Sequence, residues 1–356
     1  MYSESDLQTA GDAGVLTPEA IAAFRAHMAA SRATPSADEE HFRLITGFND
    51  IFVSIAAVIL LVAVGWIGQS VHPALAGLFT AATAWGLAEY FTRHRRMALP
   101  SIILVIAFAG GVFGTFAGLL LRHGEAWFGS QPADWIAGGL LAAIGLATAA
   151  GAWLHWRRFM VPITVAAGAA ALAGTAIALV LAATGFDRPD ENLVLALVLI
   201  AGIGIFALAM WWDRSDRARQ TRRSDVAFWL HLLAAPMIAH PVFALLGVTE
   251  GGDITSGAAV AVLGIYVLFG LVALAIDRRA LLVSALAYVL FALTRLFREF
   301  GAVELNVALT AFVIGSALLL LSAFWQNARA AVVRLLPVSL ADLLPATGAV
   351  SSRPAS

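Results

Sequence analysis

The sequence predicts an all-α integral membrane protein, a bundle of about ten transmembrane helices with both termini in the cytoplasm. Three observations support this fold class: long apolar runs, a scarcity of charged residues, and arginines concentrated in alternate loops. Of the 356 residues, 60% are hydrophobic and 13% are charged, against roughly 25% charged in a typical soluble domain. A run of roughly 20 apolar residues is long enough for an α-helix to cross a hydrocarbon core of about 30 Å. Because lipid cannot hydrogen-bond to the backbone, such runs are expected to be helices.

The apolar runs follow one another with short polar segments between them. Each run ends where charged residues, glycine or proline interrupt the apolar pattern. The predicted spans are 48–68, 73–91, 99–121, 135–154, 160–183, 193–212, 226–248, 257–276, 280–297 and 303–325.

The arginines indicate how the spans are oriented. All 22 basic residues are arginine, and 18 of them lie in the N-terminal segment, in every second loop, or in the C-terminal tail. The other four are Arg122, Arg188, Arg295 and Arg298. Short loops rich in positive charge stay in the cytoplasm. Both termini are therefore predicted to be cytoplasmic, which requires an even number of spans and fits ten.

Composition excludes several classes of function. The chain has no cysteine, so it has no disulfides, thiolate metal sites or cysteine nucleophiles. A net charge of −1 gives no indication of a nucleic-acid partner. The polar first 40 residues do not resemble a cleaved signal peptide. No nucleotide-binding or catalytic motif stands out, so no cofactor is expected, and enzymatic activity is not indicated.

The two ends are predicted to be cytosolic. Residues 1–47 form a helical segment and linker, with a first helix over 3–10 interrupted at Gly11 and Gly14, and a second helix after Thr17 as N-cap. Residues 48–325 form the transmembrane domain. Residues 326–356 form a basic amphipathic tail whose end is disordered. Such a tail is typically held against the inner leaflet; a docking peptide for a partner is the alternative.

Short motifs at both ends resemble a known group of proteins. They are the stretch Gly14-Val15-Leu16-Thr17-Pro18-Glu19, the juxtamembrane Thr46-Gly47-Phe48-Asn49-Asp50, and Leu336-Pro337 with Leu344-Pro345 in the tail. The chain is similar here to a family of uncharacterised bacterial multi-pass membrane proteins with a short N-terminal cytosolic helical unit. The resemblance implies a bacterial inner-membrane location and carries no catalytic residue to this chain.

Polar residues within spans are expensive and are therefore candidate functional residues. Asn49 and Asp50 open the first span, and Glu89 closes the second, all at the predicted inner boundary. If the carboxylates of Asp50 and Glu89 face each other, one of them holds a proton, as a proton-coupled carrier would require. The alternative is that each pairs with a neighbouring arginine.

The seventh span carries His231, Pro236 and His240. Proline removes a backbone donor and disrupts the turn before it, and broken helices hold substrate or ion sites in many transporters. The two histidines are nine residues apart, about half a turn out of phase, and so do not form one metal site. A kinked packing helix is the alternative.

Two further groups of residues are candidates for interactions. Arg295, Arg298, Glu299 and Glu304 flank the last outer turn, where they form either an ion-pair cluster or a mouth for an anionic ligand. Three glycines spaced by four residues in the third span predict a close-packing face, which is also a candidate homo-oligomer interface. They are Gly110, Gly114 and Gly118.

Three hypotheses for function follow. The first is a carrier or channel-like transporter of unknown substrate, since ten spans fit two inverted halves. The second is a non-catalytic membrane scaffold or sensor that recruits partners through its cytosolic ends. The third is an intramembrane lipid-modifying enzyme that uses His231, His240 or the carboxylates as acid–base groups. The lipid bilayer is the one partner that the sequence itself indicates.

Overall fold

The computed structural model describes residues 10–24, 48–130, 133–184, 190–217, 219, 221–247, 256–299, 306–341 and 344–345. The chain divides into two units, one made of Met1–Phe42 with Gly348–Ser356 and the other of Arg43–Thr347. Throughout the described residues the regular structure is helical, and no β-strand occurs among them.

In the smaller unit, two short helical stretches cover residues 10–12 and 18–24. Helical conformation includes Gly11 and ends before Gly14, which has a φ of 70°. The interruption therefore falls at Gly14 rather than at Gly11, because a left-handed residue ends a helix without strain only when it lacks a Cβ. The Thr17 hydroxyl accepts a hydrogen bond from the backbone N–H of Ala20 at 3.2 Å, which is the predicted N-cap interaction.

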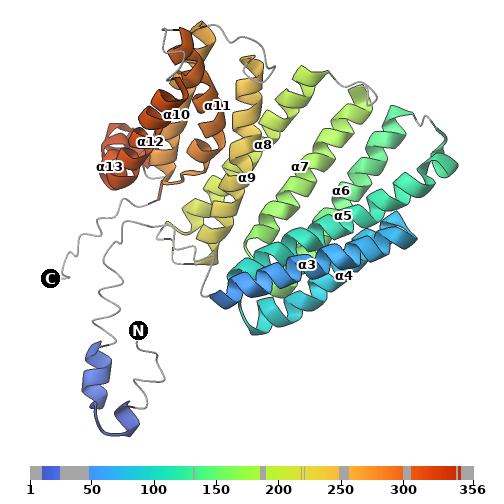
Figure 1. Ribbon diagram of the computed structural model, residues 1–356, viewed down its shortest axis with the longest axis horizontal. Coiled ribbons are helices and arrows are strands. Elements are labelled where there is room, and N and C mark those ends of the chain that lie inside the picture. The colour runs from blue at the N-terminus through green and yellow to red at the C-terminus, as the bar shows by residue number, and fades with distance from the viewer. Residues whose placement is uncertain are drawn as a thin grey trace. The chain divides into compact units, whose positions relative to one another are not determined.

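The larger unit is a series of helices that follow one another along the chain (Figure 1). Its first half consists of α3 (Phe48–Val71), α4 (Pro73–Ala88), η1 (Glu89–His94), α5 (Ala98–Phe128), α6 (Asp134–Phe159) and α7 (Ile163–Thr184). Its second half consists of α8 (Glu191–Ser215), α9 (Arg222–Leu245), α10 (Ser256–Ile276), α11 (Ala280–Glu299), α12 (Asn306–Ala323), α13 (Trp325–Leu335) and α14 (Val338–Ala341).

Helices α3 to α12 occupy the positions of the ten predicted spans, but they do not all have the length to cross a membrane. Seven are long and apolar enough: α3, α5, α6, α7, α8, α9 and α10. An eighth is obtained if α12 and α13, bent by 78°, count as one span. Helix α4 has 16 residues, and the apolar part of α11 is short. The multi-pass membrane class is thus confirmed in its coarse form, whereas ten crossings remain a prediction.

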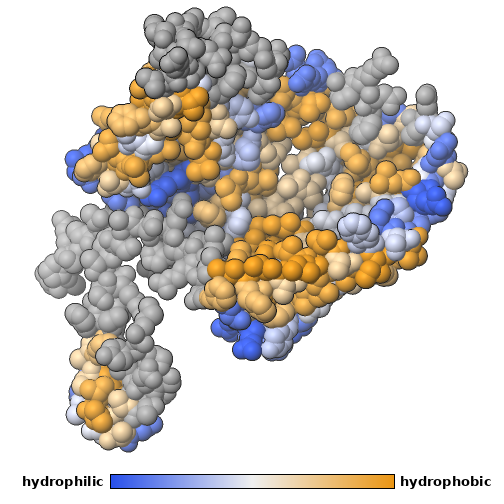
Figure 2. Space-filling view, in the orientation of Figure 1, coloured by the Kyte–Doolittle hydropathy of each residue, from blue (hydrophilic) through white to orange (hydrophobic). Residues whose placement is uncertain are grey.

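Large apolar side chains on the surface fit this class. Phe52, Trp66 and Leu121 are 65%, 77% and 84% exposed, and apolar side chains cover the face formed by α3 and α4 (Figure 2). A soluble protein rarely exposes a continuous apolar surface of this kind, whereas a surface in contact with lipid requires one.

Between α4 and α5, small residues allow the two helix backbones to approach closely. A Cβ on Gly118 would lie 2.5 Å from the backbone nitrogen of Ala74, and one on Gly114 would lie 3.6 Å from the Cα of Gly77. A Cβ on Gly110 would meet no atom within 4 Å. Gly114 and Gly118 of the predicted face therefore pack against α4 of the same chain. A homo-oligomer through this face remains a prediction.

The second half is built around α9. Its fully buried Phe243 belongs to an apolar cluster with Val262 of α10 and Val289 of α11. On its other side, Leu230 packs in a cluster with Ile205 of α8 and with residues of α7. Helix α9 is thereby enclosed on several sides, which places two of its polar side chains, Ser224 and His231, in a buried environment.

Candidate functional site: a buried polar network

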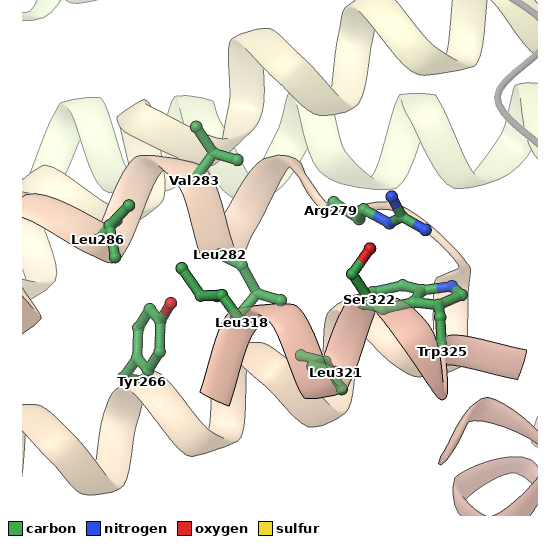
Figure 3. Close-up of a pocket in the computed structure, with 9 residues that line it drawn as sticks. All are labelled: Tyr266, Arg279, Leu282, Val283, Leu286, Leu318, Leu321, Ser322 and Trp325. Atoms are coloured by element: carbon green, nitrogen blue, oxygen red, sulfur yellow. The ribbon is translucent and has the colours of Figure 1, made fainter. Parts of the chain in front are cut away.

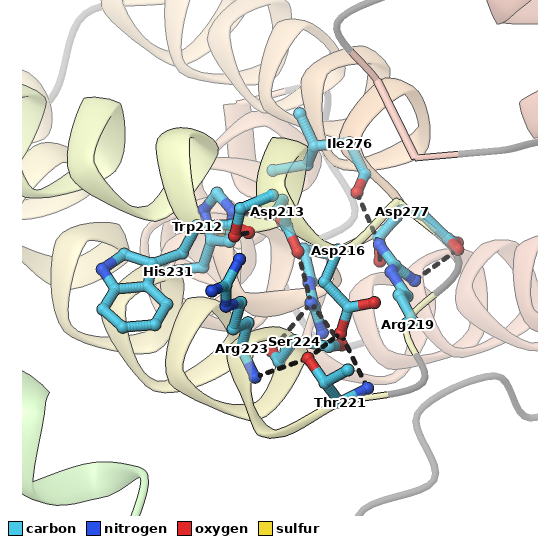
Figure 4. Close-up of polar contacts among 12 residues, drawn as sticks. Trp212, Asp213, Asp216, Arg219, Thr221, Arg223, Ser224, His231, Ile276 and Asp277 are labelled. Carbon is cyan, nitrogen blue, oxygen red and sulfur yellow. Dashed lines mark hydrogen bonds and ion pairs between the residues drawn. The ribbon is translucent and has the colours of Figure 1, made fainter.

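Polar side chains meet where α8 ends, α9 begins and α10 turns into α11 (Figure 4). At the centre lies Asp213, which is 1% exposed. One of its oxygens accepts a hydrogen bond from Nη2 of Arg278 at 2.8 Å, and the other lies 3.0 Å from Nε2 of His231. Nη2 of Arg278 also lies 3.1 Å from the carbonyl of Ser224. Two helices, α8 and α9, and the turn between α10 and α11 are thus joined through a single carboxylate.

A second carboxylate, Asp277, lies in the same turn as Arg278. It accepts hydrogen bonds at 2.7 Å from Nη1 of Arg219 and from the indole N–H of Trp325. Nε of Arg329 lies 3.8 Å from it. Asp277 has a φ of 56°, in the left-handed region. These contacts hold the α10–α11 turn in a conformation that costs about 1–2 kcal/mol for a residue with a Cβ.

The start of α9 is fixed by a third aspartate. Asp216 accepts hydrogen bonds from the backbone N–H and the hydroxyl of Thr221, at 2.8 and 2.7 Å. The Thr221 hydroxyl in turn accepts from the backbone N–H of Arg223 at 3.3 Å and caps the helix. The loop between α8 and α9 is therefore shaped by side-chain acceptors.

The network also holds part of the C-terminal tail. Arg329 of α13 is fully buried and donates a hydrogen bond from Nη2 to the carbonyl of Pro345 at 2.7 Å. Nε of Arg217 donates to the carbonyl of Leu344 at 3.2 Å, and Leu344 is itself buried. Two backbone carbonyls of the tail are thereby bound by arginines that belong to the helical bundle.

Electrostatics explain why these groups occur together. The side chains of Asp213, Asp216 and Asp277 carry three negative charges, and those of Arg219, Arg278 and Arg329 carry three positive charges, so the six balance. Burial of ions in a low-dielectric region is tolerated only when charges are paired and hydrogen-bonded. Burial, with the nearby positive charge of Arg278, lowers the pKa of Arg219 below the usual guanidinium value.

The groups present here can take part in ion pairing, hydrogen bonding and proton exchange. Asp213 and His231 are in position to share a proton. Nδ1 of His231 is buried and has no hydrogen-bond partner among the described residues. No group of three or more His, Cys, Asp or Glu side chains that could hold a metal ion occurs in the described part of the chain.

Among the residues predicted from the seventh span, only His231 belongs to this network. His240 is exposed, and its Nδ1 lies 2.7 Å from the hydroxyl of Tyr288 on α11. Pro236 lies within α9, which continues through it. The two histidines are thus in different surroundings.

The residues predicted at the inner boundary are found apart from the network. Glu89 accepts hydrogen bonds from Nε and Nη2 of Arg158 at 2.7 and 2.8 Å, and lies 3.3 Å from Nη1 of Arg93. Asp50 is buried in the first turn of α3, and Asn49 beside it is exposed. Glu89 therefore lies in an arginine clamp that joins η1 to α6.

The predicted outer cluster falls outside the described side chains. Arg295, Arg298 and Glu299 belong to the end of α11, but the positions of their side chains are not described, and Glu304 lies outside the described residues. The predicted ion pair or anion-binding mouth therefore remains a prediction.

Sequence reasoning missed Asp213, Asp277, Arg278 and Arg329, because the two arginines were treated only as markers of orientation. One available signal was the presence of aspartates in loops that are otherwise basic. An acidic residue is unexpected among Arg214, Arg217 and Arg219 unless it pairs with a particular guanidinium.

The described structure includes at least three pockets. The largest of these three, of about 490 Å³, is an apolar groove lined by small residues of α5, α6 and α7 such as Gly110, Gly145 and Ala170. A second, of about 380 Å³, lies between α5 and α6 near Glu125. The third lies between α10, α11 and α12. Neither Pro236 nor His240 lines any of the three.

Comparisons of the chain with protein-family models, with curated proteins and with solved structures found no match. The geometry of the chain itself is therefore the basis for assigning a function.

Proposed function

We propose that this multi-pass membrane protein is a non-catalytic sensor or scaffold of the bacterial inner membrane, with both termini cytoplasmic. It recruits partners through its cytosolic ends, and docking of the C-terminal tail controls that recruitment. The supporting observation is the pair of hydrogen bonds from Arg329 and Arg217 to the tail carbonyls of Pro345 and Leu344.

These bonds join the tail to the helices that cross the membrane. Arg329 lies 3.8 Å from Asp277, in the same turn as Arg278, which binds Asp213 at the end of α8. A movement of α8, α9 or α10 therefore changes the surroundings of Arg329. A sensor requires such a connection between its membrane domain and a segment that a soluble partner can reach.

The absence of cysteine from the sequence makes tail docking directly measurable. With Leu344→Cys, which replaces a buried side chain, a maleimide should react slowly in the native protein. Adding Arg329→Ala should increase the labelling rate, because the tail loses its shortest hydrogen bond to the bundle. Adding Arg334→Ala, which removes an exposed arginine of the same helix, should leave the rate unchanged.

Recruitment is tested in the same variants of the full chain. Cross-linking in native membranes, followed by purification, should recover partners in amounts that change with Arg329→Ala and not with Arg334→Ala. Equal labelling and equal partner recovery in both variants would contradict the proposal.

A proton-coupled carrier is the second candidate, and one specific observation favours it. Asp213 and His231 form a buried protonatable pair between two helices that cross the membrane, and such groups occur in the proton relays of transporters. In proteoliposomes with a trapped pH dye, a carrier should move protons, and Asp213→Asn should abolish this movement. The control is Glu89→Gln, which changes a carboxylate outside the network and should leave proton movement unchanged. Proton movement equal to that of empty liposomes would leave the sensor as the better proposal.

A further inference from the structure

Two of the three pockets lie one after the other along α5 and α6. The pocket of about 380 Å³ is lined by the last part of α5 and by α6 up to Leu141, and the groove of about 490 Å³ is lined by the middle of α5 and by α6 from Leu141 onward. Because Leu141 lines both, the two adjoin there and make up one furrow, the α5–α6 furrow. Its lining residues on α5 extend from Ile106 to Phe128, a rise of roughly 33 Å along the helix.

Small residues keep the deep part of the furrow, the groove of about 490 Å³, open. An added Cβ on Gly110 of α5 or on Gly174 of α7 would meet no atom within 4 Å, so these positions face open space. Elsewhere on α6, a Cβ on Gly138 would lie 2.8 Å from the carbonyl oxygen of Ala178 on α7. Helices α6 and α7 are thus held in close contact, while space toward α5 is left unfilled.

The deep part has the size and the character of a site for one acyl chain. Its lining residues Ile106 and Phe113 are 59% and 44% exposed. The hydroxyl of Thr148, which also lines it, already donates to the carbonyl of Ile144 at 2.9 Å. A cavity of about 150 Å³ holds benzene with its six carbons, so about 490 Å³ holds roughly 20 carbons at the same density. Since α5, α6 and α7 are long and apolar enough to span a membrane, a lipid chain is the apolar group that reaches it.

The shallow part of the furrow, the pocket of about 380 Å³, holds a carboxylate without a partner. Glu125 and Ser130 line this part, and the exposed side chain of Glu125 forms no ion pair or hydrogen bond with any described residue. Arg122, three positions earlier on α5, does not line the pocket. The pocket between α10, α11 and α12 differs, because its charged side chain, Arg279, is already stacked on Trp325 (Figure 3). The furrow thus ends in a negative charge that a ligand can reach.

Aromatic residues place this carboxylate at the depth of the lipid headgroups. Trp127 of α5 and Trp135 of α6 lie at the same end of the two helices as Glu125, and they are 56% and 70% exposed. Indole rings are enriched where the hydrocarbon core meets the headgroups. A lipid whose chain lies in the deep groove therefore brings its headgroup to Glu125.

We propose that the α5–α6 furrow binds a phospholipid with a primary ammonium in its headgroup, such as phosphatidylethanolamine, with the ammonium on Glu125 and one acyl chain in the deep groove. A primary ammonium donates up to three hydrogen bonds, and an ionised carboxylate only accepts them. Hydrogen bonds between two charged groups are stronger than those between neutral groups.

The chemistry of the headgroup determines the order of affinity. Phosphatidylethanolamine offers both a positive charge and N–H donors. Phosphatidylcholine keeps the charge, but its methylated nitrogen has no hydrogen to donate. Phosphatidylglycerol has no positive charge, and its net negative charge is repelled by Glu125. Retention is therefore expected to fall in the order phosphatidylethanolamine, phosphatidylcholine, phosphatidylglycerol.

The test measures lipid retained by the full chain in detergent, using native mass spectrometry with each of the three lipids added separately. The native protein should retain phosphatidylethanolamine best. Glu125→Gln removes the charge and nearly preserves the shape of the side chain. It should weaken retention of phosphatidylethanolamine at least about tenfold, the loss expected for one charge-assisted hydrogen bond. Glu125→Asp, which keeps the charge, should retain more of this lipid than Glu125→Gln.

The chain offers a matched control in Glu191, an exposed glutamate in the first turn of α8 that lines none of the three pockets. Glu191→Gln should leave lipid retention unchanged. A second variant, Gly110→Leu, fills the deep groove without changing charge, at a position where an added Cβ meets no atom within 4 Å. It should reduce retention of phosphatidylethanolamine and of phosphatidylcholine. Thermal unfolding of each variant in detergent separates lost binding from lost folding.

Three results would overturn the proposal. Equal losses in Glu125→Gln and Glu191→Gln would indicate nonspecific attraction of the lipid to negative charge. Equal retention of phosphatidylethanolamine and phosphatidylglycerol by the native protein would show that Glu125 selects no headgroup. A dimer that Gly110→Leu abolishes, with no change in lipid retention, would show that a second copy of the chain occupies the groove instead of a lipid.

Discussion

Asp213 and Glu89 are both carboxylates bound by arginine, and their surroundings determine what their loss would do. The side chain of Asp213 is 0% exposed and that of its partner Arg278 is 4% exposed, whereas the side chains of Glu89 and Arg158 are 31% and 39% exposed. Water solvates an arginine left alone at the surface, but it cannot reach one left alone in the interior. Loss of the carboxylate is therefore expected to destabilise the protein more at Asp213 than at Glu89.

We predict that Asp213→Ala destabilises the protein by about 3–5 kcal/mol, the usual loss when one partner of a buried ion pair is removed. Arg278 and His231 would both lose their acceptor. Unfolding of the purified protein in mixed detergent, followed by tryptophan fluorescence, measures the change. Replacing Asp213 and Arg278 together by leucine should recover most of the loss, and Glu89→Gln should cause a clearly smaller one. A loss in Asp213→Ala no greater than that in Glu89→Gln would contradict this prediction.

A second prediction concerns Met160, which ends α6 in the left-handed conformation with φ of 55° and ψ of 36°. Glycine adopts this conformation without the steric cost that a Cβ imposes. Met160→Gly should stabilise the protein by about 0.5–1 kcal/mol. The side chain is partly exposed, so little packing is lost. Met160→Ala keeps the Cβ and should give no gain in the same unfolding measurement; an equal gain in both variants would rule out backbone strain as the cause.

At the scale of the element, the side chain of His72 caps α4 and also contacts His123 on α5. Its Nδ1 accepts a hydrogen bond from the backbone N–H of Ala74 at 3.1 Å and caps α4. Its Nε2 lies 3.1 Å from Nε2 of His123 on α5, and the two rings are stacked. Since Nδ1 accepts, the neutral His72 carries its proton on Nε2 and donates it to His123.

Variants at these two positions should separate the cap from the contact between the rings. His72→Asn keeps an N-cap acceptor and loses the ring, whereas His123→Ala keeps the cap and loses its ring contacts with both His72 and Trp127. His72→Ala loses the cap and the ring, so it should be less stable than His72→Asn by about 1 kcal/mol, the usual value of a cap. Thermal unfolding in detergent gives the order, and equal stability of His72→Asn and His72→Ala would show that the cap contributes nothing.

The positions of the helices could be predicted from the sequence far better than the contacts between them. Apolar runs and polar interruptions predict where α3 to α12 lie, because the length of a span is imposed by the membrane. The predicted last span ends at Trp325, beside the bend between α12 and α13, but the contact that Trp325 makes there was not predicted. The indole of Trp325 donates to Asp277, 48 residues earlier. Such a contact depends on tertiary structure, which an apolar pattern does not encode.

The candidate site was harder to predict than the helices for the same reason. His231 was selected because it is polar within a span, and that criterion needs no knowledge of the fold. Asp213 and Arg278 are 65 residues apart, and each appears in the sequence as an ordinary loop charge. They are recognised as a pair only when α8, α9 and the α10–α11 turn are brought together.

At the scale of the whole molecule, the orientation of the bundle is testable without knowing the total number of crossings. Between Ser130 and Ser215 the chain contains α6, α7 and α8, and each is long and apolar enough to span a membrane. Three crossings place the two serines on opposite sides. The concentration of arginine in the loop after Ser215 predicts that this serine faces the cytoplasm.

We therefore predict that a membrane-impermeant maleimide labels Ser130→Cys in intact cells, and labels Ser215→Cys only after the membrane is permeabilised. Both serines are exposed, and the native chain has no cysteine to give a background signal. Labelling in a denaturant shows that both variants are expressed and reactive. If both positions react in intact cells, or if neither does, an even number of crossings separates them and the assignment of α6, α7 or α8 as a span is wrong. If only Ser215→Cys reacts, the helices cross as proposed but the arginine-rich loops lie outside the cytoplasm, and the tail that Arg329 binds is then out of reach of any cytosolic partner.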